Sequence, residues 1–305
     1  MEKEELEKQY SCSRWSHRMS ADEVIAHHIL TLAKESEKAK AEVECQIGRT
    51  YGNTENQKLD IFGADTLPGD APIFVYIHGG YWQELSREIS SYMVRPLCKA
   101  GAVVVIVGYD LAPNASMPEI VSQCRKAMSY ILNLAQHRGS SGVYICGHSA
   151  GGHLTAMMLS VDWMSECMLS SSIIKGAVLV SGVYDLRPLV NTYVNDAIKM
   201  TMDIAWDNSP WKHIDNIINR SSKRQIIVVI GEHDSPEFKR QSLEFDQKLK
   251  ENGVLTKYIE IKDTDHFNVA DNLQNDDYIL TKEILNLMKL NLDGVVNDMS
   301  KSGLA

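Results

Sequence analysis

A short segment around Ser149 constrains the fold of this chain more than any other part of its sequence. Residues 143–146 are apolar, as in a buried strand, and they lead into residues 147–151, which read Gly-His-Ser-Ala-Gly. From Leu154 onward, apolar residues recur with the spacing of one helix face. A strand, a tight Gly-x-Ser-x-Gly turn and a helix form a nucleophile elbow, in which glycines make room for a strained serine. The segment therefore predicts a nucleophilic Ser149 at the end of a strand, with its hydroxyl lifted above the sheet.

Strands alternate with helices along most of the chain. Buried strands are expected at residues 72–77, 102–107, 143–146, 176–180, 226–230 and 254–261, and helices at 22–33, 87–99, 117–136 and 278–290. Two alternating stretches, 45–47 and 58–62, flank a turn and predict an antiparallel pair at a sheet edge. This order predicts an α/β protein with a mostly parallel central sheet and helices on both faces.

We expect a single domain spanning residues 1–305, because the chain has no repeat, linker or break in composition. Residues 186–222 have no clear strand pattern, and we interpret them as a small helical cap insert over the sheet. Residues 291–305 are interpreted as a frayed tail.

The composition excludes several classes of partner. A net charge of −9 argues against nucleic-acid and anionic-membrane partners, because the electrostatic term would be repulsive. The longest apolar stretch, 102–107, is too short to span a bilayer, and the first residues have no apolar core typical of a secretory signal. Six scattered cysteines favour reduced thiols in the cytoplasm, with nuclear entry left open. The sequence indicates no cofactor and is compatible with a homodimer.

A serine hydroxyl needs a positioned base, and the base needs an orienting acid. On a sheet of this kind both follow the serine, the acid before the histidine, on loops that leave the ends of strands. The strand at 226–230 leads to Asp234, and the strand at 254–261 leads to His266. Asp185 is the alternative acid, because it follows the strand after the elbow. Ordinary packing, polar or capping roles are expected for His148, His153, His213, His233, Asp263 and Asp265.

A tetrahedral oxyanion also needs hydrogen-bond donors. His78, Gly79 and Gly80 follow the strand at 72–77 and match a loop that supplies backbone N–H groups, and Ala150 after the nucleophile supplies another. With Tyr81 in the place of a third glycine, the sequence leaves open which two of the amides of Gly79, Gly80 and Tyr81 would donate.

Aromatic and charged side chains near these motifs suggest further roles. Tyr81, Trp82 and Tyr184 would either line a substrate pocket or pack in the core, and the sequence leaves both open. Arg187 could pair with a carboxylate, but a surface position is more typical of arginine.

Two adjacent histidines, His27 and His28, do not predict a metal site. Neighbouring residues on a helix point in different directions, so their rings would not converge on one ion. We expect both at the surface, and no metal site is predicted.

Together these motifs resemble those of kynurenine formamidases (arylformamidases), in the hormone-sensitive-lipase-like branch of the α/β-hydrolase fold. Residues 78–82, His-Gly-Gly-Tyr-Trp, resemble the HGGxW signature of that family and not the commoner HGGG. Residues 7–15, 109–113 and 231–238 are also similar to vertebrate members. The resemblance covers nearly the whole chain, least clearly the insert and the tail. It implies Ser149, Asp234 and His266 as the triad and the HGGxW loop as the oxyanion hole.

The resemblance implies cleavage of N-formyl-L-kynurenine to L-kynurenine and formate in tryptophan degradation, through a formyl-serine intermediate. A general carboxylesterase with the same triad is the alternative, since the triad does not distinguish esters from formamides. A non-catalytic binding module on this fold would be expected to lack the serine or the histidine, and this chain has both.

Overall fold

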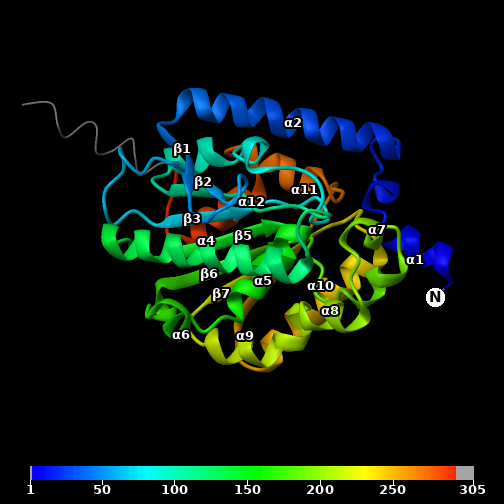
Figure 1. Ribbon diagram of the computed structural model, residues 1–305. Coiled ribbons are helices and arrows are strands. Elements are labelled where there is room, and N and C mark those ends of the chain that lie inside the picture. Colours follow the sequence, from blue (N-terminus) through cyan, green and yellow to red (C-terminus); the bar gives the residue numbers. More distant parts are fainter. Residues whose placement is uncertain (1, 293–305) are drawn as a thin grey trace, which may run out of the picture.

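The chain is organised around one sheet, seen in a computed structural model that describes residues 2–292 (Figure 1). The strand order among these residues is β1-β2-β4-β3-β5-β6-β7-β8. The strands are β1 (Cys45–Thr50), β2 (Lys58–Phe62), β3 (Ile73–Ile77), β4 (Val103–Val107), β5 (Val143–His148), β6 (Ile174–Val180), β7 (Gln225–Gly231) and β8 (Leu255–Ile261). β2 pairs antiparallel with β1 and β4, and the other neighbours are parallel. The predicted α/β class, with its antiparallel edge pair, is confirmed.

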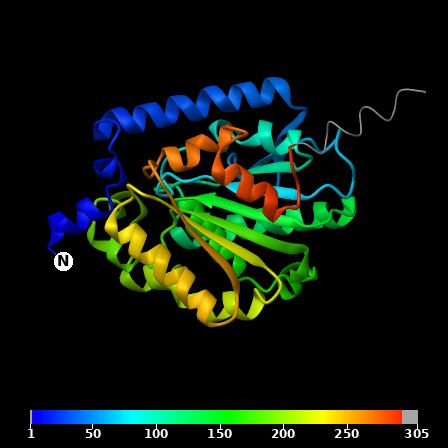
Figure 2. The ribbon, with the colours of Figure 1, turned by 180° about the vertical axis from the view of Figure 1, so that it is seen from behind.

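Helices cover both faces of the sheet, as the two opposite views show (Figures 1 and 2). One apolar core contains residues of α4 (Met117–Arg138), α5 (Ala150–Leu159) and α10 (Pro236–Glu251). The other contains residues of α2 (Ala21–Glu42), α3 (Val94–Lys99) and α12 (Ile279–Leu287). Within β3, Val75 packs into the first core and Tyr76 into the second, because successive strand residues point to opposite faces.

The insert between β6 and β7 is helical, as predicted, but consists of short pieces. They are η4 (Arg187–Asn191), α7 (Asn195–Ile198), α8 (Met202–Asp207), η5 (Pro210–His213) and α9 (Ile214–Arg220). α9 packs against α5 and α8 against α4, so the insert lies on the face that carries α5.

The helix expected at 87–99 is divided into η2 (Arg87–Ile89) and α3. Pro96 lies in the first turn of α3, where its missing N–H breaks no helical hydrogen bond. The remaining elements are α1 (Lys3–Gln9), η1 (Cys12–Trp15), α6 (Trp163–Cys167), η3 (Ser171–Ile173), α11 (Asn268–Asp271) and η6 (Asn272–Gln274).

α2 is longer than expected and lies along the outside of the molecule (Figure 1). A capping box formed by Ser20 and Glu23 begins it, and it continues to Glu42. No helix between residues 2 and 292 combines the length and the apolar character needed to cross a membrane. From residue 293 on, the tail predicted at residues 291–305 lies outside the described residues.

Gly151 allows α5 to begin directly beside the end of β3. A Cβ at this position would lie 1.9 Å from the carbonyl oxygen of Ile77 and 2.7 Å from that of His78. Both contacts are with backbone, so they cannot relax by a change of rotamer. Gly151→Ala should therefore lower the free energy of unfolding by at least about 2 kcal/mol, measured by urea denaturation.

Gly142→Ala is the matched control, because the three atoms nearest to its Cβ all belong to the side chain of the exposed Lys175, which can change rotamer. Equal denaturation midpoints for the Gly151 variant and the wild type would contradict this packing.

Candidate active site

Ser149 joins β5 to α5 in a strained backbone conformation. Its φ of 56° and ψ of −118° are uncommon for a residue with a Cβ. The amide of Ser149 donates to the carbonyl oxygen of Val180 at the end of β6, at 2.8 Å. Its side chain lines a pocket of about 300 Å³, at the small end of the range for small-molecule sites. The elbow predicted from the sequence therefore has the expected geometry.

Asp234 and His266 form a buried pair in the loops after β7 and β8. Nδ1 of His266 lies 2.6 Å from Oδ1 of Asp234. The other carboxylate oxygen accepts hydrogen bonds from Oγ of Ser181 at 2.6 Å and from the amide of Gly231 at 3.0 Å. These two donors fix the carboxylate, which in turn orients the imidazole. His266 also lines the pocket that contains Ser149, so the three predicted residues come together.

Ser181 belongs to this arrangement and was not singled out in the sequence. It follows β6 directly, with its amide bonded to the carbonyl oxygen of Val229. Its position after a strand end was the available signal, but serine in such a loop is too common to be distinctive.

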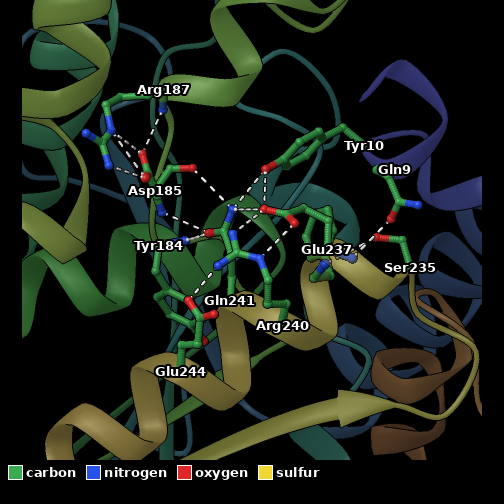
Figure 3. Close-up of polar contacts among 11 residues, drawn as sticks. Gln9, Tyr10, Tyr184, Asp185, Arg187, Ser235, Glu237, Arg240, Gln241 and Glu244 are labelled. Carbon is green, nitrogen blue, oxygen red and sulfur yellow. Dashed lines mark hydrogen bonds and ion pairs between the residues drawn. The ribbon is translucent and has the colours of Figure 1, made fainter. Parts of the chain in front are cut away.

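Asp185, the alternative acid, is engaged elsewhere (Figure 3). Its carboxylate binds Arg187 through two nitrogens, at 3.0 Å and 2.6 Å, and the guanidinium lies over the ring of Trp206. The structure therefore pairs His266 with Asp234 and not with Asp185. Arg187 is likewise bound to a carboxylate of its own chain.

The predicted oxyanion loop approaches the nucleophile closely. A Cβ on Gly79 would lie 3.2 Å from Cβ of Ser149 and 2.8 Å from the carbonyl oxygen of His148. Gly80 and Tyr81 have φ angles of 92° and 46°, and both line the pocket. Within residues 2–292, the amides of Gly79, Gly80, Tyr81 and Ala150 donate no hydrogen bond to protein acceptors. All four amides are therefore free to bind an oxyanion.

His78 holds this loop from behind. Its ring stacks on Tyr109 at 4.3 Å, and Nδ1 lies 2.9 Å from the carbonyl oxygen of Gly79. Burial lowers the pKa of His78 to about 4, which keeps it neutral.

Two of the aromatic residues proposed for the pocket lie in the core instead. Trp82 is fully buried, and its Nε1 donates to Nδ1 of His153 at 3.2 Å. Tyr184 stacks on Phe245 at 4.2 Å, away from the pocket that contains Ser149. The expectation that either lines that pocket is wrong, because internal partners hold both rings. The aromatic residues that line it are Tyr81, Tyr193 and Phe267.

The N-terminal arm, residues 3–18, supplies one wall of the pocket. Cys12 and Ser13 line it beside His266. Figure 3 shows how Tyr10 fastens the arm to α10: its hydroxyl donates to Glu237 at 3.1 Å and accepts from Gln241 at 2.9 Å. The sequence predicted no role for this arm, because contacts over more than 200 residues leave no local pattern.

The arm also holds the loop that carries His266. Asp265 accepts hydrogen bonds from Arg18 at 2.9 and 3.1 Å and from Ser16 at 2.6 Å. Burial alone would raise the pKa of Asp265, but the bonds from Arg18 and Ser16 hold it well below its usual range. Asp265 also accepts from the amides of Phe267 and Asn268, so it caps the loop as expected.

His148 supports the same loop from the sheet. Its Nε2 lies 2.7 Å from the carbonyl oxygen of His266. Burial, together with the nearby charge of His266, lowers the pKa of His148 well below its usual value. The contacts of His148 agree with the packing or polar role expected for this residue.

His28 is not at the surface, contrary to expectation. Its neighbour His27 is exposed, but the ring of His28 is buried, with Nδ1 2.5 Å from Oδ1 of Asp271. The helix periodicity did not reveal this, because α11 covers that face of α2 only in the folded chain. Among the described side chains, no group of three or more His, Cys, Asp or Glu residues is arranged to hold a metal ion.

Comparisons with known proteins agree with this site. The sequence profile of the α/β hydrolase fold matches residues 74–269. Kynurenine formamidase of Salmo salar is 44% identical to the chain, over 94% of the chain and 97% of that protein. Kynurenine formamidase of Danio rerio is 43% identical with the same coverage. The chain belongs to the kynurenine formamidase family.

Solved structures extend the comparison to the fold. A proposed thioesterase from Silicibacter sp. TM1040 superposes with a TM-score of 0.74 at 25% identity, covering 91% of this chain and 98% of that one. The two fish kynurenine formamidases match along 97% of their length. The resemblance first seen in the HGGxW loop and the elbow is therefore confirmed.

The Arg18–Asp265 pair gives a pH-dependent prediction. Because its pKa is lowered in the folded state, Asp265 stabilises the fold above its ordinary pKa of about 3.9, and this contribution is lost as the pH falls below that value. Arg18→Met should lower the free energy of unfolding by about 1–3 kcal/mol at neutral pH. The difference from wild type should shrink below about pH 4, measured by urea denaturation across pH.

Arg14→Met is the matched control, since Arg14 is exposed on the same arm. A destabilisation by Arg18→Met that stays constant into the acid range would show that the ion pair is not its source.

Proposed function

We propose that this protein is a serine hydrolase that cleaves the formamide of N-formyl-L-kynurenine, releasing L-kynurenine and formate in tryptophan degradation. The observation that carries the proposal is the match to kynurenine formamidases along 94% of the chain. The Ser149, Asp234 and His266 arrangement supplies the chemistry, but alone it would serve an ester equally well.

Ser149 is the proposed nucleophile and His266 its base. Nδ1 of His266 is held by Asp234, which leaves Nε2 to take the proton of the serine hydroxyl as Oγ attacks the formyl carbon. The resulting oxyanion would accept hydrogen bonds from the amide of Ala150 and from amides of the loop formed by Gly79, Gly80 and Tyr81. Since Gly79 lies closest to the serine, its missing side chain makes room for the formyl oxygen.

The amine leaves when the tetrahedral intermediate collapses. His266 then returns its proton to the departing nitrogen, which becomes the arylamine of kynurenine. An arylamine leaves more readily than an alkylamine, so esterase-type groups suffice for this anilide. Water, deprotonated by His266, next attacks the formyl-serine, and the collapse of that intermediate releases formate and restores Ser149.

A small pocket supports the formamidase over a general carboxylesterase. The cavity of about 300 Å³ must accept the whole aryl substrate, and the arm residue Cys12 occupies space beside His266. A formyl group needs almost no acyl room, whereas longer acyl chains need a second compartment. The site therefore suits a large leaving group attached to a minimal acyl group.

Removing the nucleophile or the orienting acid tests these roles. Ser149→Ala should lower kcat for N-formyl-L-kynurenine by about 10⁴-fold or more, with an unchanged fold. Asp234→Asn should lower kcat by about 10³–10⁴-fold, because the amide cannot orient and stabilise the imidazolium. The measurement is kcat/KM on N-formyl-L-kynurenine and on p-nitrophenyl acetate.

Asp185→Asn is the matched control, and it should retain nearly full activity because Asp185 binds Arg187. A preference for the ester, with negligible formate release, would transfer the function to the carboxylesterase. A Ser149→Ala variant that retains most activity would exclude Ser149 as the nucleophile.

The pH profile tests the role of His266 as base. Burial alone would lower the pKa of His266, but neighbouring Cys12 and Asp234 outweigh it and hold the pKa well above its usual range. Since the base must be unprotonated, activity should fall as the pH drops through this raised pKa. Cys12→Ala removes one of the two groups that raise it, so the acid limb of kcat/KM should move to lower pH.

Cys167→Ala, on α6, is the control and should leave the limb in place. An acid limb that does not move in the Cys12 variant would mean that Cys12 does not act on the catalytic base.

A further inference from the structure

The proposed substrate has charged groups for which the catalytic triad provides no binding partner. On the side chain next to its formamide, N-formyl-L-kynurenine carries an α-carboxylate and an α-ammonium group. Among the described residues that line the pocket of Ser149, none is lysine or arginine. A buried carboxylate needs a charged or hydrogen-bonding partner, so another side chain must receive it.

His28 is a polar side chain in this pocket that the proposed reaction does not use. It reaches the pocket from α2, and the residue is 5% exposed. Nδ1 is bonded to Oδ1 of Asp271 at 2.5 Å, which leaves Nε2 as the remaining polar atom of the ring. Nε2 has no hydrogen-bond partner in the described part of the chain.

The bond to Asp271 bears on the hydrogen-bonding role of Nε2 of His28. This carboxylate is 3% exposed, and its Oδ2 has no partner among the described residues. Among the described residues, His28 is thus the side chain that is bonded to this carboxylate. An imidazole with an N–H on both nitrogens can bridge two carboxylates, and since Asp271 already occupies Nδ1, Nε2 is the donor that remains for an anion.

The position of His28 suits the far end of the substrate. Its ring lies 6.2 Å from that of His148, and the ring of His148 lies 4.9 Å from that of His266. His28 and His266 therefore both lie next to His148, and both line the same pocket. In the substrate, the aryl ring, a ketone and two tetrahedral carbons separate the formyl group from the carboxylate.

We propose that His28, held by Asp271, binds the α-carboxylate of the substrate and makes the site specific for an amino-acid formamide. This inference rests on the proposed function. Glu84 is the acidic residue among the described lining side chains, and it is exposed, so it would be the partner of the α-ammonium group. The pocket then has one partner for each charge of the zwitterion.

Three substrates isolate the contact with the carboxylate. They are N-formyl-L-kynurenine, N-formylkynurenamine, which lacks the carboxylate, and the analogue in which hydrogen replaces the α-amino group. For His28→Gln we expect KM to rise about 10- to 100-fold on the two substrates with a carboxylate, with kcat changed little. On N-formylkynurenamine, kcat/KM should stay within about twofold of the wild type.

Matched variants separate binding from folding. His27→Gln, at the exposed neighbouring position of α2, should behave as the wild type on all three substrates. His28→Gln leaves Asp271 without its counter-charge, so the double variant His28→Gln/Asp271→Asn supplies a neutral amide pair at the same place. It should show the same substrate dependence as His28→Gln, with a thermal midpoint closer to that of the wild type.

The outcomes are distinct. Equal losses on all three substrates, or no change in KM, would overturn the assignment of His28. A loss confined to substrates with the amino group would place the ammonium, not the carboxylate, at His28 and would also overturn it. A wild-type protein that does not cleave N-formyl-L-kynurenine would refute the proposed function itself, whereas normal wild-type turnover with an unaffected His28 variant would refute this inference alone.

Discussion

The strained backbone of Ser149 is the constraint on which the rest of the site depends. A residue with a Cβ remains at φ 56° and ψ −118° only where its surroundings over-determine it. Here the amide of Ser149 is bonded to Val180 of the neighbouring strand. Gly79 and Gly151 let the end of β3 and the start of α5 approach to backbone contact. The sheet therefore fixes the serine, and α5 and the oxyanion loop take their positions from it.

The histidine is fixed in a different way, by segments that are distant in sequence. Its loop is held through Asp265 by the N-terminal arm and through its own carbonyl group by His148. The imidazole itself is oriented by Asp234, which Ser181 and Gly231 hold in turn. These contacts hold the short loop that carries His266 in one conformation, as a preorganised site requires.

This difference explains how far the sequence could predict the molecule. The strands, the elbow and the Asp234–His266 pair follow from local patterns, because each motif lies where a strand ends. Trp82 was ambiguous, since a tryptophan beside a glycine loop looks the same whether it faces a cavity or His153. The roles of Cys12 and His28 were missed, because the contacts that define them join the first residues of the chain to its last quarter. Contacts between such distant residues leave no periodic pattern in the sequence, so they are seen only in the folded structure.

Two histidines that line the pocket, His28 and His266, are each paired with a buried aspartate, and the surroundings of the carboxylates distinguish the two pairs. Asp234 has both oxygens occupied, one by His266 and the other by Ser181 and Gly231, so its charge is shared among several donors. Asp271 has one oxygen bonded to His28, and its other oxygen has no partner within residues 2–292. The donors from Ser181 and Gly231 hold Asp234 in one orientation, so the imidazole of His266 is kept in the fixed position that a catalytic base requires. Among the described residues Asp271 lacks such donors, and its partner His28 lines the pocket with Nε2 left for a ligand, which suits the binding group proposed for it.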